Sequence, residues 1–262
     1  MEFFVNKESI VRKIWGKSDT ILFVFAGASA EFALNKAVDW LYFTGRLPSD
    51  PLGRLFSTVM YARKIVFSEK QGALNAIDKI TAIHSAVENN RNAKIPDWAY
   101  RDVLFMLIHY SVASYELLER KITDHEKEDL YDVFLRMGVR MNLKDLPTSY
   151  PAWQVMHAKQ LNEDLVKSHY TVDLYKQYRK HLGYLRYKIL KESQKLVCPE
   201  IVCKQLGFGK ILWVSPLLWI YKISRRVKLD SVLKSILLPG DYKEQIAALD
   251  NEFTPHINRN AD

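Results

Sequence analysis

The sequence predicts an all-α protein, and two observations lead to that prediction. Only ten of the 262 residues are glycine, and few stretches alternate apolar and polar residues as half-exposed strands do. Most of the chain instead repeats its apolar residues at intervals of three and four, the period of an amphipathic helix. With no internal repeat, low-complexity tract or linker, residues 1–262 are expected to form one multi-helix bundle, with a core at about 9–249 and a flexible tail at 250–262.

The periodic segments give the expected helices in order. The first runs from about Ser9 to Trp15, and the second from about Asp19 to Ala28, with a continuation to Tyr42 left open. The next three lie at about 52–67, 71–88 and 98–120. The sequence TDHE, Thr123 to Glu126, matches a capping box and starts a helix that ends near Met141. Later helices begin near 151 and 172. Shorter helices are expected after residue 198, and Pro216 interrupts an apolar run among them.

Composition limits the functional classes. The formal charge of +8 comes without a dense Lys/Arg block interleaved with aromatic residues, so we expect no nucleic-acid partner. The N-terminus lacks the pattern of a signal peptide, and no run of roughly 18 apolar residues occurs, which predicts a cytoplasmic protein not integral to a membrane. Cys198 and Cys203 lack metal-site spacing and are predicted to be free thiols. The oligomeric state is not indicated.

A histidine lies on an apolar helical stripe in the sequence DKITAIHSAVEN. Ile77, Ile80, His84 and Val87 are spaced three, four and three apart and so share one face. His84 is then either a core residue whose ring is hydrogen-bonded to a backbone carbonyl, or a ligand of a metal or haem. The residues alone leave both interpretations open.

A polar stripe is expected on the preceding helix. Arg54, Thr58 and Tyr61 are spaced four and three apart on an otherwise apolar segment. Such a stripe either faces solvent or lines a buried pocket with a few placed polar groups.

The remaining histidines differ in their surroundings. His109 lies in the middle of the apolar run from Val103 to Ala113, so it is expected in a buried helix. A second histidine on another core helix favours a functional site over two ordinary core residues. His157, His169 and His181 lie on polar segments and are expected to be solvated. No dinucleotide, nucleotide-triphosphate or serine-hydrolase motif is present.

The order of these motifs resembles the rubber oxygenase (latex-clearing protein) catalytic-domain family, also called the MpaB-like oxygenases. DPLGRLFST is similar to the family's D-P-x-x-R-x-x-x-T and carries Arg54 and Thr58, while IHSAV is similar to its histidine helix and carries His84. VLFMLIHYS resembles the next helix, where His109 matches a second histidine. MGVRMNLKDLPTSY and LLPGDYKEQI resemble two later segments, so the resemblance covers most of 9–249.

The resemblance implies a haem b-dependent oxygenase or oxidase that acts on an apolar small molecule with dioxygen. His84 would be the proximal iron ligand in a haem pocket between core helices, and the stripe that contains Ile80 would form an apolar wall. Arg54 and Thr58 would be catalytic donors near dioxygen or the haem edge, and Tyr61, on the same stripe, would join the cofactor contacts.

The sequence departs from the family at two places. Rubber-cleaving members can place an iron-capping lysine next to the threonine, where this chain has Ser57, and a family glutamate has no clear match, Asp39 being the nearest carboxylate. Polyisoprene is therefore not the expected substrate. His109 would either ligate iron from the distal side or act catalytically beside the pocket as a hydrogen-bonding or proton-transferring group, and the resemblance favours the second role.

Two other functions are compatible with these patterns. The chain could be a non-catalytic helical protein that binds haem or lipid. Residues 211–228 place Trp213 and Trp219 next to Lys222 and Arg225, a pattern that suits peripheral contact with a membrane as well as a helix packed on the core.

Overall fold

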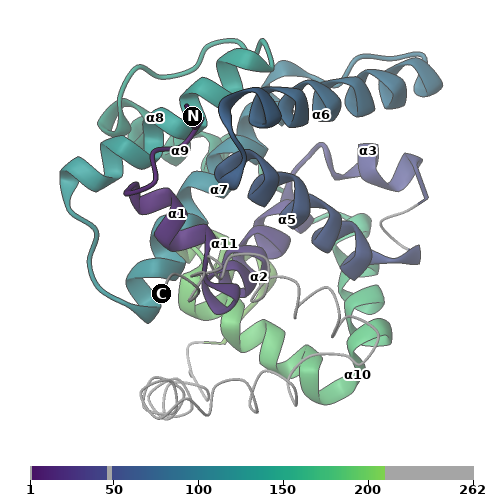
Figure 1. The fold of residues 1–262 in the computed structure, drawn as a ribbon. Helices are drawn as coiled ribbons and strands as arrows, with labels where there is room; N and C mark the ends of the chain where they lie inside the picture. The colour runs from purple at the N-terminus through teal and green to yellow at the C-terminus, as the bar shows by residue number, and fades with distance from the viewer. Residues whose placement is uncertain (1, 46–48, 210–262) are drawn as a thin grey trace, which may run out of the picture.

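The computed structural model describes residues 2–45 and 49–209, which are built from α-helices (Figure 1). The helices are α1 (Ile10–Trp15), α2 (Ser18–Leu34), α3 (Val38–Phe43), α5 (Pro51–Phe67), α6 (Lys70–Arg91), α7 (Asp97–Leu118), α8 (Asp124–Arg140), α9 (Tyr150–Glu163), α10 (His169–Val197) and α11 (Glu200–Leu206). Within these residues, two isolated backbone bridges occur and neither forms a strand. The all-α prediction is confirmed.

Helix α2 is the central element of the described bundle. It contains no Lys or Arg, most of its residues are buried, and it packs mainly against α7 and α10. A helix that is apolar on most sides is stable only inside such a bundle. Helix α7 approaches α2 closely at Gly27, where a Cβ atom would lie 2.1 Å from Cδ1 of Tyr110. The absence of a side chain at Gly27 thus lets the two helices meet.

The continuation of the second helix to Tyr42, which the sequence left open, does not occur, because α2 ends at Leu34 and α3 begins at Val38. Asn35 leaves the helical conformation with ψ of 134°. Its Oδ1 accepts a hydrogen bond from the amide of Ala37 at 2.8 Å, and its Nδ2 donates to Asp102 at 2.8 Å. These bonds offer the chain an alternative to another helical turn.

The other predicted boundaries lie within a few residues of the observed ones. The capping box is confirmed, because Thr123 Oγ1 accepts from the amide of Glu126 and the Glu126 carboxylate accepts from the amide of Thr123. Helix α10 is kinked at Gly183, whose φ of 72° is in the region that favours glycine.

Helices α5 and α6 form a hairpin. It packs on the core at the end where the two helices are connected, between Phe67 and Lys70. Near that end Ile65, Val66 and Ile77 are buried. Burial then decreases along α6, where Ile80 and Val87 are partly exposed. The predicted apolar stripe is therefore fully buried only at its start, and His84 lies at the margin of the core.

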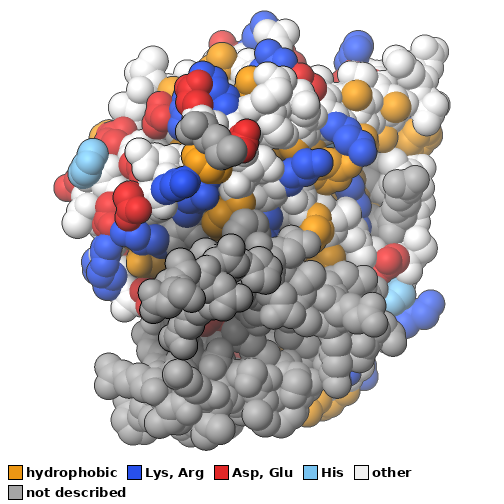
Figure 2. Space-filling model, viewed as in Figure 1, with side chains coloured by type: hydrophobic (Ala, Val, Ile, Leu, Met, Phe, Trp, Pro, Cys, Tyr) orange, Lys and Arg blue, Asp and Glu red, His pale blue; other side chains and the backbone are white. Residues whose placement is uncertain are grey.

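The surface of the described part mixes charges of both signs. On the face in Figure 2, Lys and Arg side chains lie among Asp and Glu side chains. Exposed ion pairs such as Arg140 with Asp78 and Arg136 with Asp132 contribute only about 0–1 kcal/mol each. The fold therefore depends chiefly on its apolar core.

Some sequence predictions concern residues beyond those described. Residues 211–228, the LLPGDYKEQI segment and the tail at 250–262 lie outside the described residues. Among the helices that are described, none combines the length and apolarity needed to cross a bilayer.

Candidate functional site

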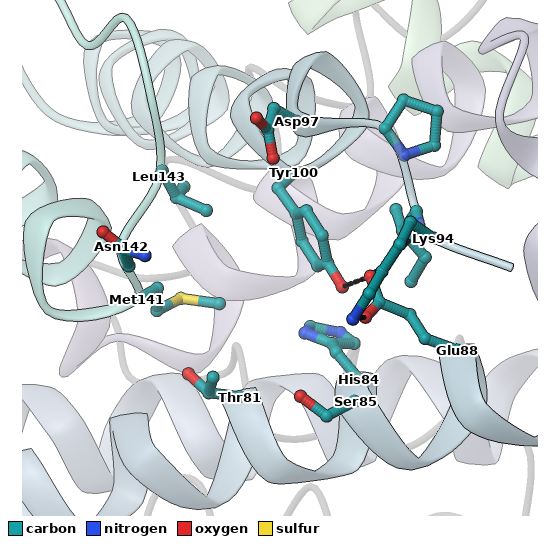
Figure 3. Close-up of a pocket in the computed structure, with 12 residues that line it drawn as sticks. Thr81, His84, Ser85, Glu88, Lys94, Asp97, Tyr100, Met141, Asn142 and Leu143 are labelled. Carbon is teal, nitrogen blue, oxygen red and sulfur yellow. Dashed lines mark hydrogen bonds and ion pairs between the residues drawn. The ribbon is translucent and has the colours of Figure 1, made fainter.

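A pocket of about 530 Å³ lies between α6, the start of α7 and the segment that follows α8 (Figure 3). This volume is in the range of small-molecule sites, roughly 300–1,000 Å³. Thr81, His84 and Glu88 line it from α6, and Tyr100 lines it from α7. The lining mixes polar and apolar side chains, so it is more polar than the apolar wall expected from the sequence.

His84 projects from α6 into this pocket. Its ring meets that of Tyr100 edge-on, with 5.1 Å between ring centroids. Its Nδ1 is buried and has no hydrogen-bond partner among the described residues. Most buried polar atoms in proteins are hydrogen-bonded, so this nitrogen is one of the exceptions in the described part of the chain.

The electrostatic environment keeps His84 neutral. Burial and, to a smaller extent, the positive charge of Arg54 together lower the pKa of His84 to about 4, although the carboxylate of Glu88 acts in the opposite direction. At pH 7 the imidazole therefore keeps a lone pair. A neutral imidazole is the form of histidine that binds metal ions.

Only part of the predicted polar stripe on α5 lies near His84. Arg54 is close enough for its charge to act on the imidazole. The hydroxyl of Thr58 donates to the backbone carbonyl of Arg54 at 3.2 Å, and that of Ser57 donates to the same carbonyl at 2.8 Å. Tyr61 is partly exposed. Arg54, Thr58, Tyr61 and Ile80 are not among the residues that line the pocket.

Asp39, the carboxylate nearest to the position of the family glutamate, is bound in an ion pair. Its Oδ2 lies 2.7 Å from Nη2 of Arg91, at the end of α6. The same guanidinium lies 4.1 Å from the centre of the Trp40 ring. These contacts fasten α3 to the helix that carries His84.

His109 lies in a different part of the bundle from the pocket. It follows Tyr100 by nine residues on α7, a rise of about 13 Å along an α-helix. Burial and the neighbouring His157 lower the pKa of His109 to about 4, while Glu31 and a hydrogen bond to the backbone of Val197 act in the opposite direction. Its Nε2 is buried and unpaired among the described residues.

His109 belongs to a buried polar group that we call the Glu31 cluster, which consists of Glu31, His109, Tyr110, His157 and Gln160. Glu31 is fully buried, and its carboxylate accepts a hydrogen bond from Tyr110 at 2.9 Å and one from Gln160 at 3.2 Å. Nε2 of His157 lies 3.9 Å from Oε1 of Glu31. The rings of His109 and His157 are 5.0 Å apart.

The prediction that His157 is solvated is wrong, because its exposed fraction is 5%. Trp153, His157, Gln160 and Leu161 share one face of α9, and all four are buried. Their spacing of four, three and one is typical of one buried helical face. The polar residues around them in the sequence made this pattern hard to recognise. Glu31 was missed as well, although it is the one acidic residue in the run ILFVFAGASAEFAL.

The described residues contain no three His, Cys, Asp or Glu side chains placed to hold a metal ion together. A haem requires only one axial side chain, and the neutral His84 with its unpaired Nδ1 fits that role. Cys198 and Cys203 are free thiols, as predicted.

Comparison with known proteins adds one positive finding. The family model described as "ER-bound oxygenase mpaB/B'/Rubber oxygenase, catalytic domain" matches residues 14–217. No curated protein and no solved structure matches the chain.

Proposed function

Because the chain belongs to the ER-bound oxygenase mpaB/B'/rubber oxygenase catalytic-domain family, we propose that it is a haem b-dependent oxygenase acting on an apolar small molecule with dioxygen. Family membership supports the oxygenase role. The haem, the apolar substrate, a cytoplasmic location and membrane contact through 211–228 are parts of the proposal.

The observation that carries the proposal is the state of His84. A buried, neutral imidazole with an unpaired Nδ1 is suited to be the axial ligand of iron. A bound haem would supply redox-active iron for chemistry with dioxygen, and the protein would supply its binding and electrostatic environment.

The residues near His84 have distinct proposed roles. Arg54 carries a guanidinium, which pairs well with carboxylates such as those of a haem and can stabilise developing negative charge. Thr58 and Tyr61 are proposed as further polar contacts and Ile80 as an apolar contact. In the structure, the Thr58 hydroxyl donates to its own helix backbone, so a catalytic role requires it to exchange that bond for another.

His109 is proposed to accept or donate protons and not to ligate iron. An N–H of the His109 ring donates a hydrogen bond to the backbone carbonyl of Val197, and Nε2 is left as an unpaired acceptor among the described residues. Electron paramagnetic resonance of the haem-loaded ferric protein tests this role. A high-spin signal that persists in His109→Ala is expected, whereas conversion from low spin to high spin would identify His109 as an iron ligand.

The central experiment is haem titration followed by visible spectroscopy. The unaltered chain should show a Soret band at one haem per chain, and His84→Ala should lose most bound haem while its helical circular dichroism persists. His125→Ala is the matched control, because His125 is exposed in the first turn of α8. Full haem retention in His84→Ala would refute the ligand assignment, and no Soret band in any variant would favour the lipid-binding alternative.

A further inference from the structure

Glu88 connects three parts of the pocket through one buried carboxylate. It lies one turn after His84 on α6, and its exposed fraction is 7%. Its carboxylate accepts hydrogen bonds from Lys94 Nζ at 2.8 Å, from the amide of Ile95 at 2.9 Å and from the hydroxyl of Tyr100 at 3.2 Å (Figure 3). It thus ties α6 both to the connector at 92–96 and to the first turn of α7.

We propose that Glu88 is a positioning residue for His84: by holding the hydroxyl of Tyr100 it fixes the aromatic ring that limits the orientation of the imidazole. This inference rests on the proposed function, because the positioned group is the proposed iron ligand. Glu88 would act through Tyr100 and would not contact the iron.

The hydrogen bonds of Glu88 are of the strong, charge-assisted kind. Burial opposes ionisation of Glu88, but the bonds from Lys94, Ile95 and Tyr100 outweigh it and lower the pKa of the carboxyl. Bonds to an ionised carboxylate are roughly twice as strong as neutral ones.

The hydrogen bond between Tyr100 and Glu88 affects His84 because the rings of Tyr100 and His84 are in contact. The two rings meet at 61° with 5.1 Å between centroids, the edge-to-face arrangement that aromatic pairs favour. Since no hydrogen bond fixes Nδ1 of His84 among the described residues, ring packing is the restraint that the structure shows on the imidazole. Residues that orient a ligating histidine commonly affect metal affinity 10–100-fold, and roughly that scale is expected here.

The first test measures position without haem. In the full-length chain with isotope-labelled Tyr and His, a nuclear Overhauser cross-peak should join the rings of Tyr100 and His84. Glu88→Ala should lose it, whereas Glu88→Gln should keep it, since the amide oxygen can still accept from the Tyr100 hydroxyl. Asp78→Ala is the matched control, because Asp78 is an exposed α6 carboxylate that binds Arg140. An unchanged cross-peak in Glu88→Ala would overturn the proposal.

The second test uses the haem-loaded protein. Glu88→Ala should bind haem about tenfold more weakly and should shift the g-values of the ferric cyanide complex, which report the orientation of the axial imidazole. Glu88→Gln should restore both, and Asp78→Ala should change neither. Unchanged g-values in Glu88→Ala would contradict the proposal. If the cross-peak behaves as expected but even the unaltered chain binds no haem, the proposed function fails while the positioning of His84 by Glu88 stands.

Discussion

Gly27 is a residue at which α2 and α7 approach closely, and its substitution should lower the stability of the fold. An added Cβ would lie 2.1 Å from Tyr110, whose ring is fully buried and whose hydroxyl is held by Glu31. Overpacking of this kind costs about 1–3 kcal/mol, so Gly27→Ala should lower the free energy of unfolding in urea by that amount. Gly72→Ala is the control, because its methyl group would meet only the Ser68 side chain, at 3.1 Å and beyond, and should change stability by less than about 1 kcal/mol.

Asp102 is fully buried, and this should make stability depend on pH. Burial raises the pKa of Asp102 to about 7, against about 3.9 in an unfolded chain. Between these values the folded state binds more protons than the unfolded state, so the contribution of Asp102 to stability is present below pH 4 and is lost as the pH rises through 7.

The variant Asp102→Asn removes this titration. Its amide oxygen can still accept the hydrogen bond from Asn35, which Asp102 Oδ2 accepts at 2.8 Å in the structure. Between pH 4 and pH 7 the unaltered chain should therefore lose unfolding free energy relative to Asp102→Asn. Above pH 7 the difference between the two proteins should stay constant. Parallel curves in urea titrations across this range would contradict the assignment.

At the scale of elements, the attachment of α3 to α6 depends on Arg91. Arg91 pairs with Asp39 and lies over the Trp40 ring, both at partly exposed positions. Such pairs contribute about 0–1 kcal/mol, and cation–π contacts at exposed sites about 0.5–1 kcal/mol. We expect Arg91→Ala to speed amide hydrogen exchange in α3 while global stability falls by no more than about 2 kcal/mol. Arg140→Ala, which breaks the exposed pair with Asp78, should leave exchange in α3 unchanged. Equal exchange rates of α3 in the Arg91→Ala variant and the unaltered chain would show that other contacts hold this helix.

For the whole molecule, haem binding should appear as thermal stabilisation. A ligand that binds only the folded state at 100 times its dissociation constant adds about 2.7 kcal/mol, which for a protein of this size raises Tm by roughly 5–10 °C. The rise should be absent in His84→Ala and present in His125→Ala. A rise of equal size in His84→Ala would place the haem elsewhere in the molecule.

The sequence by itself determined the secondary structure and several local features. Helical periodicity and the scarcity of glycine predicted the all-α class, and the capping box at Thr123 was read from four residues because it is made by neighbours in the chain. The order of short motifs also indicated the family to which residues 14–217 were then matched. These features are local, so a pattern of adjacent residues is enough to specify them.

Only the tertiary structure decided which faces of the helices are buried and which polar side chains meet. Glu31, His109 and His157 come from three helices, and their meeting depends on how α2, α7 and α9 pack. Glu88 likewise reaches Tyr100 only because the connector at 92–96 brings the first turn of α7 back to the end of α6. Contacts between distant segments depend on packing across the whole bundle, because each helix can bury any face that its neighbours cover.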